Sequence, residues 1–196
     1  MSGPSFRTHL LERTDTGQYT ELLYDDGVND AVLVCAAHGG QTEPGTAEQA
    51  VELAARLPRA SCWACLGYDE HHSAFELWHP PSSAFSPDAY PLLAEIADRG
   101  FETVISFHGL DDDRVLVGGG VDTDTKRRVS DRLESAVTHP VEPVSSGRYA
   151  GVSPNNFVNW LSADGGLQLE QSAAVRLDEG DAVVAVLENL IERGRL

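Results

Sequence analysis

The hydrophobic and polar positions of this chain form two kinds of pattern, one typical of strands and one typical of helices. Short apolar runs bounded by turn residues are typical of buried strands, whereas apolar residues three or four positions apart are typical of one face of a helix. The strand pattern covers residues 19–24, 30–37, 60–66, 101–107, 115–117, 141–144 and 167–171. The helical pattern covers residues 45–57, 88–99, 122–137 and 181–193, and a helical turn is expected at 155–161.

The order of these segments predicts the fold. A strand, a helix and a second strand occupy residues 30–66, and such units favour parallel strands joined by a right-handed crossover. The 196 residues, 41% of them hydrophobic, are enough for one sizeable core. We therefore predict a single α/β domain over residues 1–196, with three α/β/α layers around a central mixed, mostly parallel sheet. The mostly polar residues 1–18 are expected to lead into an edge strand at 19–24.

Two of the predicted strands end in His-Gly. His38 follows residues 30–37, His108 follows residues 101–107, and Glu43 lies on the same turn as His38. Ligands of open α/β sheets bind beyond the carboxyl ends of the strands, and catalytic zinc sites use three protein ligands such as imidazole and carboxylate. His38, Glu43 and His108 are therefore candidate zinc ligands. The competing interpretation is an ordinary turn at each strand end.

The last predicted strand carries an unusual carboxylate. Gln168 and Glu170 share one face of residues 167–171, and Leu167, Leu169 and Gln171 share the other. A carboxylate on a buried strand is costly unless it is paired or belongs to a site. Glu170 is therefore a candidate functional residue.

Five short motifs follow one another between residues 30 and 176: His38-Gly39-Gly40-x-x-Glu43-Pro44-Gly45-Thr46, Ser106-Phe107-His108-Gly109, Val117-Gly118-Gly119, Asn155-Asn156-Phe157-Val158-Asn159 and Gly166-Leu167-Gln168-Leu169-Glu170. Their order resembles the poly-γ-glutamate hydrolase family, which is often phage-encoded and is similar to zinc carboxypeptidases in fold. The resemblance implies one zinc ion held by His38, Glu43 and His108. It also implies that Glu170 is the general base of an amide hydrolysis.

Two other functions remain open from the sequence. The first is a zinc amidase that acts on short γ-glutamyl or D-amino-acid peptides, and the second is a non-catalytic metal-binding protein related to phage. The family usually has arginine after the Asn-x-Val-Asn segment, whereas this chain has Trp160. Because such an arginine could bind a substrate carboxylate, the difference bears on the substrate more than on the chemistry.

The free α-carboxylates of a γ-glutamyl substrate need cationic or hydrogen-bonding partners. Arg148, Arg114 and Asn156 lie near the motifs and are candidate substrate-binding residues. A structural salt bridge is the competing role for either arginine. A substrate polymer or peptide is the expected partner, and the chain is expected to be a monomer.

The charge of the chain excludes some functions. Its 31 acidic residues against 14 basic ones give a formal net charge of -17, and Lys126 is the only lysine. Such a surface repels nucleic acid and anionic membranes. The composition is similar to that of halophilic archaeal proteins, although a GC-rich bacterial genome also replaces lysine with arginine.

The remaining features predict a cytoplasmic protein without further cofactors. The cysteines Cys35, Cys62 and Cys65 are too few for a disulfide framework and lie in apolar runs, so we expect reduced core residues. No apolar span or signal-peptide core is present, and release by cell lysis would apply if a virus encodes the chain. In the irregular segment 67–91 we expect solvated histidines, although His71 or His79 could contact substrate.

Overall fold

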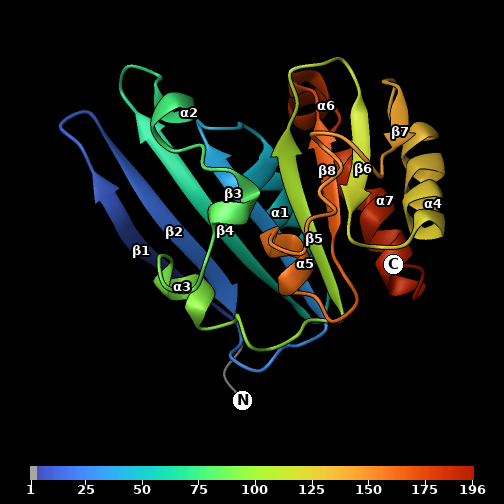
Figure 1. Cartoon of the computed structure of the whole chain (residues 1–196), viewed down its shortest axis with the longest axis horizontal. Helices are drawn as coiled ribbons and strands as arrows, with labels where there is room; N and C mark the ends of the chain where they lie inside the picture. The colour runs from blue at the N-terminus through green and yellow to red at the C-terminus, as the bar shows by residue number, and fades with distance from the viewer. Residues whose placement is uncertain (1–3) are drawn as a thin grey trace.

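An eight-stranded mixed sheet forms the middle layer of the protein. The computed structural model describes residues 4–196. The strand order is β1-β2-β4-β3-β5-β8-β6-β7 (Figure 1). The strands are β1 (Ser5–Arg13), β2 (Gly17–Asp25), β3 (Val32–Gly40), β4 (Ala60–Asp69), β5 (Thr103–Gly109), β6 (Val115–Gly119), β7 (Val141–Pro143) and β8 (Leu167–Gln171).

Four neighbouring strands of this sheet, β4, β3, β5 and β8, run parallel to one another. β2 pairs antiparallel with β1 and β4, and β6 pairs antiparallel with β8 and parallel with β7. The carboxyl ends of β3, β5 and β8 therefore meet at one edge of the sheet, which is where open α/β sheets bind ligands.

Helices cover both faces of the sheet. The long helices α1 (Thr46–Arg56), α4 (Thr123–Glu134) and α7 (Gly180–Glu192) enclose one core with residues such as Val34, Leu53 and Leu187, and α6 (Ala173–Asp178) precedes α7. Figure 1 views the other face, which carries the short elements α2 (Ala74–Leu77), η1 (Ser82–Ala84), α3 (Pro91–Ala94) and α5 (Phe157–Trp160). A second core lies there around Trp63 and Phe157. The predicted three-layer α/β/α fold is confirmed. Within residues 4–196 no helix is long and apolar enough to cross a membrane.

The N-terminal prediction was wrong. Ser5–Arg13 forms β1, which is the edge strand, and the predicted edge strand at residues 19–24 lies inside the sheet as part of β2. Almost every residue of β1 is exposed. A strand with two solvated faces has no alternating apolar pattern, so its sequence did not indicate a strand. Residues 1–3 of the predicted polar lead lie outside the described residues.

The helix predicted at residues 88–99 was also wrong in extent, because only Pro91–Ala94 is helical. Its first turn is held by the buried carboxylate of Glu21, which accepts hydrogen bonds from the backbone N–H groups of Leu92 and Leu93 at 2.9 and 2.6 Å. The amphipathic pattern at residues 122–137 predicts that Lys126 lies on the exposed face of that helix. This prediction is wrong: Lys126 is buried, as is Val129, because α4 packs against β6 and β7.

Two of the three glycines at residues 118–120 belong to a strand rather than to a turn. β6 continues to Gly119, whose φ of 101° lies in the left-handed region that favours glycine. A Cβ atom on Gly118 would lie 2.6 Å from the carbonyl oxygen of Ala150. Gly118 therefore lets the chain around Ala150 pack directly on β6. The three cysteines are buried, as predicted, and carry no disulfide.

A buried ion pair between β2 and the segment after α3 gives a prediction about stability. Asp25 accepts hydrogen bonds from both terminal nitrogens of Arg99 at 2.6 and 2.7 Å and from the hydroxyl of Ser61 at 2.6 Å. Burial alone would raise the pKa of Asp25, but these hydrogen bonds and the charge of Arg99 hold it below its ordinary value. Removing one member of a buried pair costs about 3 kcal/mol. We expect Asp25→Asn to lower the free energy of unfolding at pH 7 by about that amount.

The pH dependence of this effect follows from the sign of the shift. A carboxylate with a lowered pKa in the folded state contributes stability above its unfolded pKa of about 3.9, and that contribution is lost as the pH falls through the folded pKa. Denaturant unfolding from pH 7 to pH 3 should show the deficit of Asp25→Asn shrinking below about pH 4. Asp15→Asn, at an exposed position, is the control. A deficit that is the same at every pH would contradict this account.

Candidate metal centre

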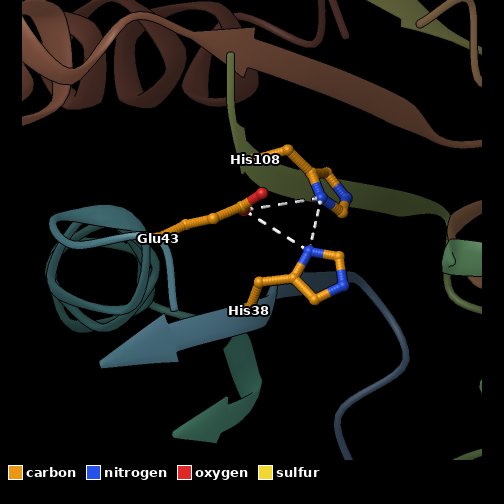
Figure 2. A group of neighbouring side chains, drawn as sticks. All are labelled: His38, Glu43 and His108. Carbon is orange, nitrogen blue, oxygen red and sulfur yellow. Dashed lines mark hydrogen bonds and ion pairs between the residues drawn. The ribbon is translucent and has the colours of Figure 1, made fainter. Parts of the chain in front are cut away.

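Three buried side chains converge at the carboxyl edge of the parallel strands. His38 lies on β3, His108 on β5, and Glu43 on the turn between β3 and α1 (Figure 2). The two Nδ1 atoms of the histidines are 3.2 Å apart, and Glu43 Oε2 lies 3.4 Å from His38 Nδ1 and 3.8 Å from His108 Nδ1. The three atoms lie within 4.8 Å of one another. The structure thus brings together the three residues that the sequence proposed as ligands.

The turn between β3 and α1 directs Glu43 back toward His38. The backbone N–H of Glu43 donates to the carbonyl oxygen of His38 at 2.7 Å, which closes a tight loop. Gly40 and Gly45 have φ values of 70° and 95°, and a Cβ atom on Gly39 would lie 2.6 Å from the Cβ of Ala47. Side chains at these glycines would force the loop open. The glycine-rich sequence is therefore what allows a residue five positions later to face His38.

The outer nitrogen of each histidine is hydrogen-bonded. His38 Nε2 lies 2.8 Å from the carbonyl oxygen of Pro80, and His108 Nε2 lies 2.7 Å from the hydroxyl of Ser106. A carbonyl oxygen only accepts, so the proton of His38 is on Nε2 and the lone pair is on Nδ1. The hydroxyl of Ser106 can accept from Nε2 of His108 in the same way. In that tautomer the Nδ1 lone pairs of both histidines face the carboxylate of Glu43. Such partners fix the tautomers of metal-binding histidines.

The charges at this cluster suit a divalent cation. Glu43 Oε2 is buried and has no hydrogen-bond partner among the described residues. Burial alone would raise the pKa of Glu43, but the neighbouring imidazoles of His38, His79 and His108 hold it well below its usual range. Burial lowers the pKa of His108 to about 3. An ionised carboxylate and a neutral imidazole are the forms that bind metal, and two nitrogens with one oxygen suit zinc.

A cavity of about 540 Å³ opens beside the cluster. One wall is formed by residues 79–83 and the other by segments from Gly147 to Asn156, and Gln168 and Glu170 line it together with the three metal-site residues. Burial raises the pKa of Glu170 to about 8, and the negative charge of Glu43 adds to this effect, whereas the Gln168 hydrogen bond and the charges of Arg148 and Arg176 oppose it. A carboxyl whose pKa is shifted upward toward neutral pH is suited to taking up and releasing a proton during a reaction.

The three predicted substrate-binding residues lie in different surroundings. Arg148 lines the cavity and is exposed, and its guanidinium lies 5.2 Å from the ring centre of Tyr149. Asn156 also lines the cavity, but its side-chain amide is hydrogen-bonded to the protein. Arg114 is not among the lining residues, and its guanidinium is paired with Asp112 and Glu142 at 2.8 and 3.1 Å.

His79 is a residue of this site whose role the sequence did not indicate. It comes from the irregular segment 67–91, where the histidines were expected to be solvated, and its spacing to the other motifs carries no signal. Its Nε2 donates to Glu43 Oε1 at 2.9 Å, and its ring stacks on Phe75 with centroids 4.2 Å apart. Because this bond occupies one carboxylate oxygen, only Oε2 of Glu43 is directed toward the histidines.

We expect His79→Ala to lower the affinity for zinc about 10- to 100-fold, the usual effect of removing a hydrogen-bond partner of a metal ligand. Competition with a chromophoric chelator measures this affinity directly. His71→Ala is the matched control, because His71 is exposed on the same segment and does not line the cavity. Equal zinc affinity in His79→Ala and the wild type would show that the bond to Glu43 has no role in binding.

The sequence is similar to one described family over most of its length. The model of the poly-gamma-glutamate hydrolase family matches residues 5–181. The protein YndL of Bacillus subtilis (strain 168) is 31% identical over 169 residues, which cover 85% of this chain. The same match covers 62% of YndL, so this chain spans less than two thirds of that relative's length.

Solved structures have the same fold. A structure of YndL in a zinc-free apo form superposes with a TM-score of 0.73 at 26% identity and 91% coverage of both chains. A bacteriophage poly-gamma-glutamate hydrolase gives a TM-score of 0.70 at 20% identity, covering 99% of this chain and 91% of its own. A metallo-carboxypeptidase from Burkholderia cenocepacia gives 0.56 at 13% identity, covering 97% and 65%. The expected similarity to carboxypeptidases in fold is therefore confirmed.

Proposed function

Since the chain belongs to the poly-gamma-glutamate hydrolase family, we propose that it is a zinc-dependent hydrolase that cleaves γ-glutamyl amide bonds, with poly-γ-glutamate as its substrate. The observation that carries this proposal is the placement of two imidazole nitrogens and one carboxylate oxygen within 4.8 Å of one another, beside a cavity that Glu170 also lines. The existence of a zinc-free form of the relative YndL supports zinc as the metal.

In this mechanism His38, Glu43 and His108 hold the zinc ion, and Glu170 moves the proton. When bound, zinc polarises the scissile carbonyl and lowers the pKa of a water towards about 7. Glu170 takes a proton from the attacking water and delivers it to the amine that leaves. His79 and the carbonyl oxygen of Pro80 keep Glu43 and His38 in their binding orientations.

Arg148 is the proposed partner for a substrate carboxylate. Every residue of a γ-linked glutamate polymer has a free α-carboxylate, and Arg148 is exposed on the cavity wall. A guanidinium binds a carboxylate through two parallel hydrogen bonds. Arg114 is already paired outside the cavity, so a substrate role would require it to leave Asp112 and Glu142.

A second candidate is a zinc amidase for short γ-glutamyl peptides. Trp160, in place of the arginine usual in the family, favours this candidate because one cation that could bind the polymer is absent.

A comparison of substrates separates the two candidates. Purified protein, loaded with zinc, is given long poly-γ-glutamate or di- and tri-γ-glutamyl peptides. The assay is run at about 1 M salt, where a Debye length of about 3 Å screens the repulsion between the polymer and this acidic chain. Efficient cleavage of the polymer supports the first proposal, and cleavage of the short peptides alone supports the second.

A further inference from the structure

Glu170 is held by a side-chain amide rather than by a charged group. Gln168 lies two residues earlier on β8, on the same face, and its Nε2 donates to Glu170 Oε1 at 2.8 Å. Both side chains are buried, with 4% of Gln168 and 7% of Glu170 exposed. One oxygen of the carboxylate is therefore occupied, which limits the rotation of the carboxyl group and leaves Oε2 without this constraint.

The direction of that hydrogen bond is set by Asn156. Nδ2 of Asn156 donates to Gln168 Oε1 at 2.7 Å, so the oxygen of the Gln168 amide faces Asn156 and its nitrogen faces Glu170. Asn156 itself is fixed by two backbone groups. The N–H of Val158 donates to Asn156 Oδ1 at 3.3 Å, and the carbonyl oxygen of Gly151 accepts from Nδ2 at 3.3 Å.

These four bonds can form with only one arrangement of the amides. A backbone N–H only donates and a backbone carbonyl only accepts, so neither Asn156 nor Gln168 can turn its amide over without losing a bond. Gly151 supports the arrangement, because its φ is 63° and a Cβ atom there would lie 2.8 Å from Gln168 Oε1. The loop can therefore lie against the amide of Gln168 only with glycine at this position.

We propose that Asn156 and Gln168 are positioning residues. They form a relay, a chain of hydrogen bonds from the backbone at Val158 to Glu170 in which the order of donors and acceptors is fixed. The relay presents an N–H group to Glu170 and holds its carboxylate in the orientation that accepts a proton from the attacking water. This assignment rests on the proposed function, in which Glu170 is the general base. Asn156 then acts through Gln168 and not by binding substrate.

Asn156→Asp tests the direction of the relay. Aspartate still accepts the N–H of Val158 and keeps the cap of α5, but it has no N–H group for Gln168 or for the carbonyl oxygen of Gly151. A carboxylate oxygen of the aspartate would face Gln168 Oε1. The amide of Gln168 is therefore expected to turn over, so that its nitrogen faces the aspartate and its oxygen faces Glu170. We expect kcat to fall about 10- to 100-fold, the loss of one hydrogen bond to a charged group, while KM changes less than about 2-fold. Asn155→Asp, an exposed neighbour given the same charge, is the control.

A double-mutant cycle separates the relay from a structural role. Gln168→Met removes both the donor to Glu170 and the acceptor for Asn156, and should itself lower kcat about 10- to 100-fold. In this background Asn156→Asp should have little further effect, because residues in one hydrogen-bond network are not additive. Zinc content and the thermal unfolding midpoint are measured for each variant. On the zinc-free protein, the NMR signals of the Gln168 side-chain amide should shift in Asn156→Asp and not in Asn155→Asp.

Each other outcome overturns the relay. Multiplicative effects of Asn156→Asp and Gln168→Met on kcat would show that the two residues act independently. An effect of Asn156→Asp on KM alone would assign Asn156 to substrate binding. Equal turnover by the Glu170→Gln variant and the wild type would overturn the proposed function and, with it, the relay. If Glu170→Gln lowers kcat as expected but the effects of Asn156→Asp and Gln168→Met on kcat multiply, the relay is overturned and the proposed function stands.

Discussion

Glu170→Gln is expected to lower kcat for γ-glutamyl bond cleavage by about 10²- to 10⁴-fold, the range that a positioned general base contributes. Glutamine is the same size and can occupy the same space on β8, but it cannot take a proton from water. The side chain lies in the cavity beside Glu43 and is not one of the three convergent donors. Zinc content should therefore stay at the wild-type value. Steady-state kinetics and metal analysis on the same sample measure both quantities.

The matched control for Glu170→Gln is Glu102→Gln. Glu102→Gln makes the same chemical change at an exposed position just before β5, at the other end of that strand from His108, and should leave kcat unchanged. A non-catalytic metal-binding protein would show no effect of Glu170→Gln on any activity. A variant with wild-type kcat and bound zinc would therefore remove Glu170 from the mechanism.

His108→Ala should remove both the metal and the activity. His108 is buried and contributes one of the two imidazole nitrogens, so the variant leaves only one nitrogen and one carboxylate oxygen. Catalytic zinc sites use three protein ligands, and we expect zinc binding too weak to survive gel filtration and hydrolysis below detection. Metal analysis after gel filtration, with polymer cleavage assayed on the same fractions, checks both expectations.

The control for this variant is the loss of a histidine elsewhere. His9→Ala, on the exposed strand β1, should retain zinc and activity. Comparing the thermal unfolding of His108→Ala with that of zinc-free wild type separates the loss of a ligand from the loss of the fold. Stoichiometric zinc in the folded His108→Ala protein would contradict the ligand assignment.

The residues of the metal cluster could be predicted because they follow local patterns. His38 and His108 come directly after apolar strands, and Glu43 lies within reach on a turn rich in glycine. Glu170 was indicated by its position on a buried strand with Gln168. These signals depend only on neighbouring residues and on the period of a strand. Ser106 could have been found in the same way, because it lies two positions before His108 and so on the same face of β5.

The order of the strands could not be read from the sequence in the same way. β8 is the last strand of the chain, yet it lies between β5 and β6, with Glu170 in register opposite His108. That placement brings the proposed base beside the proposed ligand. Strand order depends on packing between segments far apart in the sequence, and local periodicity contains no information about it.

The contacts around the cluster were missed for a similar reason. Pro80 and His79 reach the site from a segment with no regular pattern, and their roles arise from a backbone carbonyl and a single hydrogen bond. Glu21 holds α3 through a buried carboxylate that is 71 residues from its partner Leu92. β1 has two exposed faces and therefore no apolar signal. For Pro80, His79 and Glu21 the deciding interaction is between residues far apart in the chain, whereas β1 pairs with the next strand and lacked only the apolar pattern that marks a strand.

The most direct test of the account is the dependence of hydrolysis on zinc bound at this site. Wild-type protein is stripped of metal with a chelator, zinc is titrated back, and bound zinc and cleavage of poly-γ-glutamate are measured on the same samples. Cleavage should be absent in the metal-free protein, rise in proportion to bound zinc and reach its plateau at one zinc per chain. Undiminished cleavage by the metal-free protein would contradict the account.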